Sequence, residues 1–303
     1  MDNAKRVFEV SRKKGITHLT EVQRTAIPII EKGFDCLVIA PTGFGKTEAA
    51  VLPLLTKLLQ ATEENQQGVQ LLYITPLRSL NRDMLLRMTH WCEELGITLG
   101  VRHGDTTQTE RKKQNQNPPR FLITTPESLN ALLVSQHFEN ALGNVRFVVV
   151  DEVHDLIQNK RGVQLSLALE RLQLKAKQKI QRIGLSATVG CPKNASRFIS
   201  PNAKIATMTL QREINLSIET PTGKKQQTVA FPFTDQASSA RVKRIKDLIE
   251  AHGKTLVFVN TRSNAESLTA QLFQIPQLKE RVAVHHSSIS KNARIDTEQD
   301  FKQ

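Results

Sequence analysis

A glycine-rich turn between two regular elements constrains the fold of this chain more than any other feature. Residues 40–47 have the sequence Ala-Pro-Thr-Gly-Phe-Gly-Lys-Thr, a phosphate-binding loop pattern with Ala where Gly is commonest. The apolar run 35–39 before it predicts a buried strand, and the apolar spacing of 47–60 after it predicts a helix. Strand, glycine turn and helix is the setting that such a loop requires. We therefore expect an α/β sheet that binds a nucleoside triphosphate at this turn.

Each part of the turn has a chemical role in binding a triphosphate. Successive backbone N–H groups and the start of the following helix would face the β- and γ-phosphates. The Lys46 amine adds a positive charge, and the Thr47 hydroxyl can hold Mg²⁺. A chance glycine turn is the alternative, and the flanking elements argue against it. The residues expected to bind the nucleotide here are Ala40, Pro41, Thr42, Gly43, Phe44, Gly45, Lys46 and Thr47.

Two adjacent carboxylates follow a second strongly apolar run, residues 146–150. Asp151 would hold Mg²⁺, directly or through water, while Glu152 would orient and deprotonate the attacking water. Taken alone, such a pair often just stands at the start of a helix, where the helix dipole stabilises acidic side chains. Downstream of a phosphate loop in an α/β chain, the pair indicates hydrolysis of the bound triphosphate.

Alternating apolar runs and helical patterns indicate an open, doubly wound parallel sheet, since its strands are apolar rather than alternating. Strands are predicted at 36–39, 71–75, 98–102, 121–124, 147–150 and 182–186, and helices at 20–31, 47–59, 80–95, 127–134 and 163–177. In such sheets ligands gather at the carboxyl ends of the strands. Pro28 and Pro53 fall inside two of the predicted helices and should bend them or mark local irregularities.

The pattern changes after about residue 208, where a polar, proline-containing stretch begins. A second α/β pattern follows, with strands predicted at 215–219, 255–260 and 281–285, and helices at 241–252, 264–273 and from 291 onward. We expect a first lobe over residues 1–208 and a smaller, partial second lobe over residues 209–303.

The charge balance predicts a polyanionic partner. Lys and Arg number 42 against 29 Asp and Glu, a net charge of +13, so nucleic acid is the first candidate. A basic surface kept for solubility is the alternative. Aromatic residues make up only 5% of the chain, which favours contacts to the nucleic-acid backbone over base stacking. Three scattered cysteines, no signal peptide and no membrane-length apolar run predict a cytoplasmic location.

Several segments together resemble a known family. The loop at 40–47, the sequence Asp-Glu-Val-His at 151–154 and Ser-Ala-Thr at 186–188 resemble motifs I, II and III of superfamily 2 nucleic-acid helicases, DExH-box branch. More closely, the segments 75–84, 102–106, 124–129 and 184–190 resemble the archaeal and bacterial large helicase-related (Lhr) proteins. The resemblance covers nearly the whole chain. It implies a P-loop NTPase with RecA-like lobes, a helicase or translocase that uses ATP and Mg²⁺ on DNA or RNA.

The resemblance also implies roles for individual residues. Gln23 would read adenine, although a glutamine on a helix surface is the reading without the family match. The catalytic set would be Lys46, Asp151, Glu152 and His154, and the residues that couple nucleotide state to lobe movement would be His154, Ser186 and Thr188. The residues implied to contact the nucleic-acid backbone are Pro76, Arg78, Thr124, Thr125, Pro126 and Glu127, with Thr261 and Arg262 in the second lobe; ordinary helix capping is the alternative reading of the strand-end loops.

The chain departs from the family pattern after the His-His pair at 285–286. Motif V and the arginine-bearing motif VI do not follow, and such arginines contribute about 10³–10⁵ in turnover in comparable enzymes. We therefore expect ATP binding with impaired hydrolysis from this chain alone. A fragment, a split subunit completed by a second polypeptide and a decayed copy all fit this pattern. An ATP-gated nucleic-acid-binding subunit without unwinding activity is the alternative function, and the choice between DNA and RNA stays open.

Overall fold

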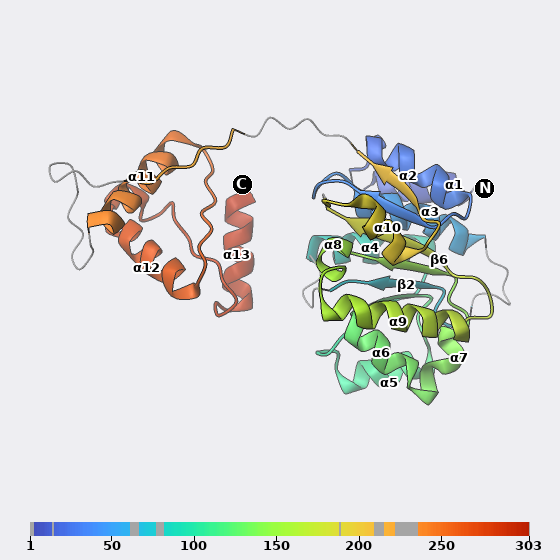
Figure 1. The fold of residues 1–303 in the computed structure, drawn as a ribbon. Helices are drawn as coiled ribbons and strands as arrows, with labels where there is room; N and C mark the ends of the chain where they lie inside the picture. Colours follow the sequence, from blue (N-terminus) through green and yellow to red (C-terminus); the bar gives the residue numbers. More distant parts are fainter. Residues whose placement is uncertain are drawn as a thin grey trace. The chain divides into compact units, whose positions relative to one another are not determined.

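The computed structural model describes residues 3–13, 15–60, 67–76, 82–187, 189–208, 215–221 and 236–302. The chain divides into two compact units, Met1–Gln211 and Arg212–Gln303, each drawn in Figure 1 and described here by itself. The first unit is built on a parallel sheet and holds the predicted phosphate loop.

The sheet of the first unit has the strand order β3-β4-β2-β5-β6-β1-β7, and every described strand pair is parallel. Its strands are β1 (Cys36–Ile39), β2 (Leu71–Ile74), β3 (Leu99–Arg102), β4 (Phe121–Thr124), β5 (Phe147–Val150), β6 (Gln181–Ser186) and β7 (Lys204–Thr207). The predicted doubly wound α/β sheet is thus confirmed. The last strand was not predicted, because it is an edge strand in which only Ala206 is buried.

Helices cover both faces of this sheet (Figure 1). They are α1 (Asn3–Arg12), α2 (Glu21–Glu31), α3 (Lys46–Leu59), α4 (Arg82–Leu95), α5 (Gln108–Gln116), α6 (Pro126–Leu133), α7 (Glu139–Leu142), α8 (Val153–Leu156), α9 (Lys160–Lys175) and α10 (Pro192–Ile199). Pro28 and Pro53 lie inside α2 and α3, and the expected bend or irregularity at these prolines stays a prediction.

Residues that alternate along each strand enter two separate hydrophobic clusters. Tyr73 and Val149 belong to the cluster that contains the buried residues of α3 and α4, whereas Leu72 and Val148 belong to the cluster under α6 and α9. This is the two-fold alternation of side chains along a strand. It explains why the strands are apolar on both faces and why the period-two signal in the sequence is weak.

The second unit contains α11 (Gln236–Ala251), α12 (Arg262–Phe273), a 3₁₀ turn at Pro276–Leu278 and α13 (Lys291–Lys302). A small apolar cluster that includes Val242 and Leu278 joins α11, α12 and the turn. The strands predicted at 215–219, 255–260 and 281–285 are wrong: these residues are described, and none of them is in a strand. A strand exists through its ladder with a neighbour, which an apolar run does not supply by itself. Leu256 and Phe258 are accordingly 65% and 86% exposed.

Across the described parts of both units, no helix is both long and apolar enough to cross a membrane.

Candidate nucleotide site and nucleic-acid face

The predicted phosphate loop joins β1 to the first turn of α3, and its glycines have backbone angles that other residues adopt only with strain. Gly43 has φ +88° and Gly45, the residue before α3, has φ +80°. A Cβ on Gly45 would also lie 2.2 Å from Gln23 Nε2, whereas one on Gly43 would meet nothing within 4 Å. The loop therefore brings backbone N–H groups to the start of α3 in the arrangement that favours an anion.

Lys46, the first residue of α3, points back into the loop. Its Nζ donates a hydrogen bond to the Ala40 carbonyl oxygen at 2.7 Å. Burial lowers the pKa of Lys46, and the negative charges of Glu152, Asp151 and Glu48 oppose that shift. The predicted catalytic lysine and the two predicted carboxylates are therefore neighbours, although they lie more than a hundred residues apart in the sequence.

Gln23 is only 2% exposed and connects α2 to the phosphate loop. Its Oε1 accepts a hydrogen bond from the Thr20 backbone N–H at 2.9 Å, which completes a capping box at the start of α2. Its Nε2 donates to the Gly45 carbonyl oxygen at 3.2 Å. The amide is thus at the nucleotide loop, as the resemblance implied, and its reading of adenine stays a prediction.

Asp151 follows β5, and both of its carboxylate oxygens are held. Oδ1 accepts a hydrogen bond from the Glu152 N–H at 2.8 Å, and Oδ2 accepts one from the Tyr73 hydroxyl at 2.6 Å. Burial raises the pKa of Asp151, while these two hydrogen bonds and the Lys46 charge oppose the rise. Burial and the Asp151 charge raise the pKa of Tyr73 well above its usual value, so this fully buried hydroxyl stays protonated and donates.

Glu152 is the one non-glycine residue with positive φ among the residues that the structure describes, with φ 50° and ψ 46°. A left-handed backbone at a residue with a Cβ costs about 1–2 kcal/mol and is characteristic of functional sites. Burial and the charge of Asp151 raise the pKa of Glu152. The raised pKa makes this carboxylate a better proton acceptor, which fits the predicted role of activating water.

His154 links the end of β5 to the end of β6. The Ala187 N–H donates to His154 Nδ1 at 3.2 Å, and the Ser186 hydroxyl lies 3.3 Å from the same nitrogen. A neutral ring with Nδ1 as acceptor carries its proton on Nε2, which lies 3.5 Å from Glu152 Oε2. The structure thus brings two of the three predicted coupling residues together; Thr188 lies outside the described residues.

The donors expected for Mg²⁺ fit that ion. The Asp151 carboxylate and the Thr47 hydroxyl are hard oxygen ligands; Asp151 accepts from the Tyr73 hydroxyl, and Thr47 donates to the Met84 sulfur that Tyr73 also contacts. In the described part of the chain, no group of three or more His, Cys, Asp or Glu residues forms an all-protein metal cage.

The loops after β2 and β4 hold most of the residues predicted to contact nucleic acid. Pro76 follows β2, and Thr124, Thr125, Pro126 and Glu127 lie at the end of β4 and the start of α6. The Thr125 hydroxyl accepts a hydrogen bond from the Ser128 N–H, so this threonine caps α6, as the alternative reading proposed. Arg78 lies outside the described residues.

Arg161 joins these two loops, and sequence reasoning missed it. Its Nε and Nη2 donate to the Glu127 carboxylate at 2.6 and 3.2 Å, and Nη2 also donates to the Pro76 carbonyl oxygen at 2.8 Å. The Glu127 carboxylate is therefore bound to a cation of its own chain. Arg161 lies in the first turn of α9, where a positive charge opposes the helix dipole, and that misplaced charge was the available sequence signal.

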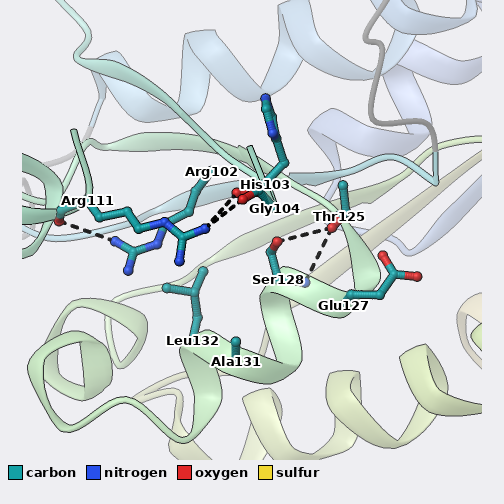
Figure 2. Close-up of a pocket in the computed structure, with 9 residues that line it drawn as sticks. All are labelled: Arg102, His103, Gly104, Arg111, Thr125, Glu127, Ser128, Ala131 and Leu132. Carbon is teal, nitrogen blue, oxygen red and sulfur yellow. Dashed lines mark hydrogen bonds between the residues drawn. The ribbon is translucent and has the colours of Figure 1, made fainter. Parts of the chain in front are cut away.

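A pocket of about 230 Å³ lies beside these loops, at the carboxyl ends of β3 and β4 (Figure 2). Figure 2 shows the Arg111 guanidinium group turned to the backbone oxygens of His103 and Gly104, to which Nη2 donates at 3.2 and 3.0 Å. The lining residues are Arg102, His103, Gly104, Arg111, Thr125, Glu127, Ser128, Ala131 and Leu132. The pocket thus joins the segment 102–106 to the predicted nucleic-acid loop at 124–127.

In the second unit, the two predicted contact residues lie at the start of α12. Thr261 caps this helix by accepting a hydrogen bond from the Asn264 N–H at 3.2 Å. Arg262 donates to the hydroxyl groups of Ser287, at 2.8 Å, and of Ser288.

The family of the chain follows from its matches to known families. The DEAD/DEAH box helicase family matches residues 20–197, and the helicase conserved C-terminal domain matches residues 240–303. The chain belongs to the DEAD/DEAH box helicases.

Among curated relatives, the ATP-dependent helicase Lhr-Core of Methanothermobacter thermautotrophicus is 36% identical over 93% of this chain, which spans 35% of that relative. The Lhr-Core helicase of Saccharolobus solfataricus is 32% identical over 94% of this chain and 34% of its own length. The solved structure of Mycobacterium smegmatis helicase Lhr bound to ssDNA and AMP-PNP matches with a TM-score of 0.76 and 36% identity, over all of this chain and 40% of that one. Over the matched span the chain is thus similar to Lhr helicases, and it spans about a third of the length of these Lhr-Core relatives.

Proposed function

We propose that the 303 residues of this chain form the ATP-binding core of a motor that moves along or unwinds nucleic acid. The observation that carries the proposal is the convergence of Lys46, Asp151 and Glu152 on the phosphate loop of a parallel sheet. Membership of the DEAD/DEAH box helicases supports it. We propose residues 1–208 as the ATP-binding lobe and 209–303 as part of the second lobe.

Binding of ATP would rearrange contacts that the phosphate loop now makes with itself. Lys46 would exchange the Ala40 carbonyl oxygen for phosphate oxygens, a stronger hydrogen bond because both partners are charged. Thr47 and Asp151 would hold Mg²⁺, which neutralises charge on the phosphates when bound. Glu152 would orient the attacking water and accept its proton, and Gln23 would contact the adenine edge.

Nucleic acid would lie across the loops that follow β2, β3 and β4. The loops after β3 and β4 present a helix N-terminus, hydroxyl groups and arginines, which suit a phosphate backbone and read no sequence. The Lhr helicase of Mycobacterium smegmatis was solved bound to ssDNA and AMP-PNP, which supports single-stranded DNA as the first substrate to test. The contact residues are proposed as Pro76, Arg78, Thr124, Thr125, Pro126 and Glu127, with Thr261 and Arg262 from the second lobe.

Nucleotide state would reach the nucleic-acid loops through motif III. His154 contacts Ser186 on one side and Glu152 on the other, so a change at the catalytic carboxylate can move the end of β6. We propose His154, Ser186 and Thr188 as this coupling set.

Nucleotide binding and ATP hydrolysis by the 303 residues, with and without single-stranded DNA or RNA, test the proposal. We expect Mg²⁺-dependent ATP binding that Lys46→Ala abolishes, and slow turnover, because the motif VI arginines are not among these residues. A wild-type chain that binds no ATP would contradict the proposed function. Fast turnover abolished by Lys46→Ala would contradict the requirement for those arginines. A second polypeptide that completes the second lobe stays a prediction from the sequence.

A further inference from the structure

Tyr73 is a fully buried hydroxyl that none of the motifs uses, and it is the single tyrosine of the chain. It lies on β2, which pairs with β5 so that Tyr73 is opposite Val149. Because alternate residues of a strand share a face, Asp151 follows Val149 on the Tyr73 side of the sheet. The tyrosine side chain is long enough to reach one step along β5, where its hydroxyl meets Asp151 Oδ2 at 2.6 Å.

Three groups surround this hydroxyl. Asp151 accepts a hydrogen bond from it, the sulfur of Met84 is 3.7 Å away, and the Thr47 hydroxyl donates to the same sulfur at 3.8 Å. Asp151 and Thr47 are the two residues assigned to Mg²⁺ on other grounds, namely the end of β5 and the last position of the phosphate loop. A single buried hydroxyl therefore holds one protein ligand of the proposed ion and shares the Met84 sulfur with the other.

The Asp151 carboxylate has few other restraints. Its Oδ1 accepts a hydrogen bond from the Glu152 N–H, and Glu152 has a backbone in the left-handed region. With Oδ1 and Oδ2 each held by one donor, the carboxylate plane is fixed, and each oxygen keeps a lone pair for a metal ion or its bound water. Without the tyrosine hydroxyl, Oδ2 could turn towards the Lys46 amine, whose charge already acts on Asp151.

We propose that Tyr73 is a positioning residue for the magnesium ion of the nucleotide site. Its hydroxyl orients Asp151, so that this ligand is set before Mg²⁺ arrives. This inference rests on the proposed binding of Mg²⁺ and ATP. Hydrogen-bond partners of metal ligands typically change metal affinity by about 10- to 100-fold when they are removed.

The test measures nucleotide binding and the Mg²⁺ requirement separately. Binding of a fluorescent ATP analogue to the full 303-residue chain is measured in EDTA and then as a function of Mg²⁺ concentration. We expect Tyr73→Phe to bind the analogue in EDTA as the wild type does. It should need roughly tenfold more Mg²⁺ to reach half of the Mg²⁺-induced change in analogue binding. Thr56→Val, which removes a buried hydroxyl that donates to the Leu52 carbonyl oxygen within α3, is the matched control and should keep the wild-type Mg²⁺ requirement.

A second readout uses the wild-type chain, so it stands even where Tyr73→Phe fails to fold. A single tyrosine gives a single ¹³Cζ resonance in a selectively labelled protein, and its shift reports what the hydroxyl donates to. We expect this resonance to move when Mg²⁺ joins the nucleotide-bound chain and when Asp151 is replaced by Asn. An unmoved resonance, or equal Mg²⁺ requirements in wild type and Tyr73→Phe, would overturn the inference. A wild-type chain that binds no nucleotide in either condition would overturn the proposed function, and the inference with it.

Discussion

Single residues at the end of β5 combine strain, burial and charge. Glu152 has a left-handed backbone, and its carboxylate lies beside that of Asp151 in a partly buried position. Such an arrangement is unfavourable for folding and persists where chemistry requires it. Replacing Glu152 should therefore change hydrolysis and stability in opposite directions.

Glu152→Gln keeps the size and hydrogen-bonding shape of the side chain and removes its ability to accept a proton. We expect ATP hydrolysis to fall about 10²–10⁴-fold, the usual contribution of a general base, while the affinity for Mg²⁺ and ATP stays within a few-fold of wild type. Single-turnover hydrolysis and equilibrium binding, measured on the same preparation, check this. Turnover at the wild-type rate would show that another group activates the water.

The same substitution predicts a pH-dependent gain in stability in the absence of nucleotide and Mg²⁺. Because the folded-state pKa of Glu152 is raised, its ionisation destabilises the fold, so its favourable contribution is present at low pH and is lost as the pH rises through that pKa. Glu152→Gln should therefore melt above the wild type at pH 7, and the two melting temperatures should converge in acid.

Glu94 provides the control of opposite sign. A hydrogen bond from Lys13 lowers the pKa of this exposed carboxyl, so its contribution is present at neutral pH and is lost as the pH falls. Glu94→Gln should melt at or below the wild type at pH 7, never above it. Thermal melts from pH 4 to 8 check both variants. If both raise or both lower the melting temperature at pH 7, the opposite pKa shifts assigned to Glu152 and Glu94 are wrong.

Strands and helices contribute to the nucleotide site through their ends, and the phosphate loop between β1 and α3 is the clearest example. Gly45→Ala introduces a Cβ at φ +80° that also collides with Gln23 Nε2, whereas Gly33→Ala introduces one at φ +85° with nothing within 4 Å. Both variants bear the left-handed backbone cost of about 1–2 kcal/mol, so the difference between them isolates the contact with Gln23. We expect Gly45→Ala to unfold at lower denaturant concentration than Gly33→Ala, and equal midpoints would contradict the loop geometry.

Loss of the Arg161 side chain should weaken the binding of nucleic acid without changing the binding of ATP. Arg161→Ala releases both the Glu127 carboxylate and the Pro76 carbonyl oxygen, which loosens the loops after β4 and β2. We expect the affinity for single-stranded DNA to fall roughly tenfold, the effect of losing charge-assisted hydrogen bonds, with ATP affinity unchanged. Anisotropy of a labelled oligonucleotide and binding of a fluorescent nucleotide measure the two affinities.

Arg182→Ala is the matched control for this prediction. It removes the same charge from the same unit and breaks an ion pair with Glu170, at the start of β6, whereas the Arg161 contacts lie at the strand ends. If both variants lose DNA affinity equally, net charge explains the effect and the role of Arg161 in positioning the loops is wrong.

Much of the first unit could be predicted from the sequence, because each strand there is a local apolar run bounded by turn residues. The predicted strands at 36–39, 121–124 and 147–150 match β1, β4 and β5. The same reasoning failed at 255–260, since an apolar run forms a strand only beside a partner. The contacts of Tyr73 and Arg161 join residues 78 and 85 positions apart, and they depend on which strands are neighbours, which local patterns do not contain.

For the whole molecule, the net charge of +13 and the nucleotide site describe two binding activities that a motor must couple. Counterion release makes binding to a nucleic-acid backbone weaken steeply with salt, whatever the sequence of the strand. Binding to charge alone is independent of nucleotide. Coupling is therefore the property that separates a helicase core from a basic protein that also binds ATP.

The most direct measurement is the affinity of the chain for a labelled single-stranded oligonucleotide, at fixed ionic strength, with and without Mg²⁺ and a non-hydrolysable ATP analogue. We expect the analogue to change the oligonucleotide affinity of the wild type several-fold, and Lys46→Ala to bind the oligonucleotide with no response to the analogue. An oligonucleotide affinity that is the same with and without the analogue, in a wild-type chain shown to bind that analogue, would contradict the proposed coupling.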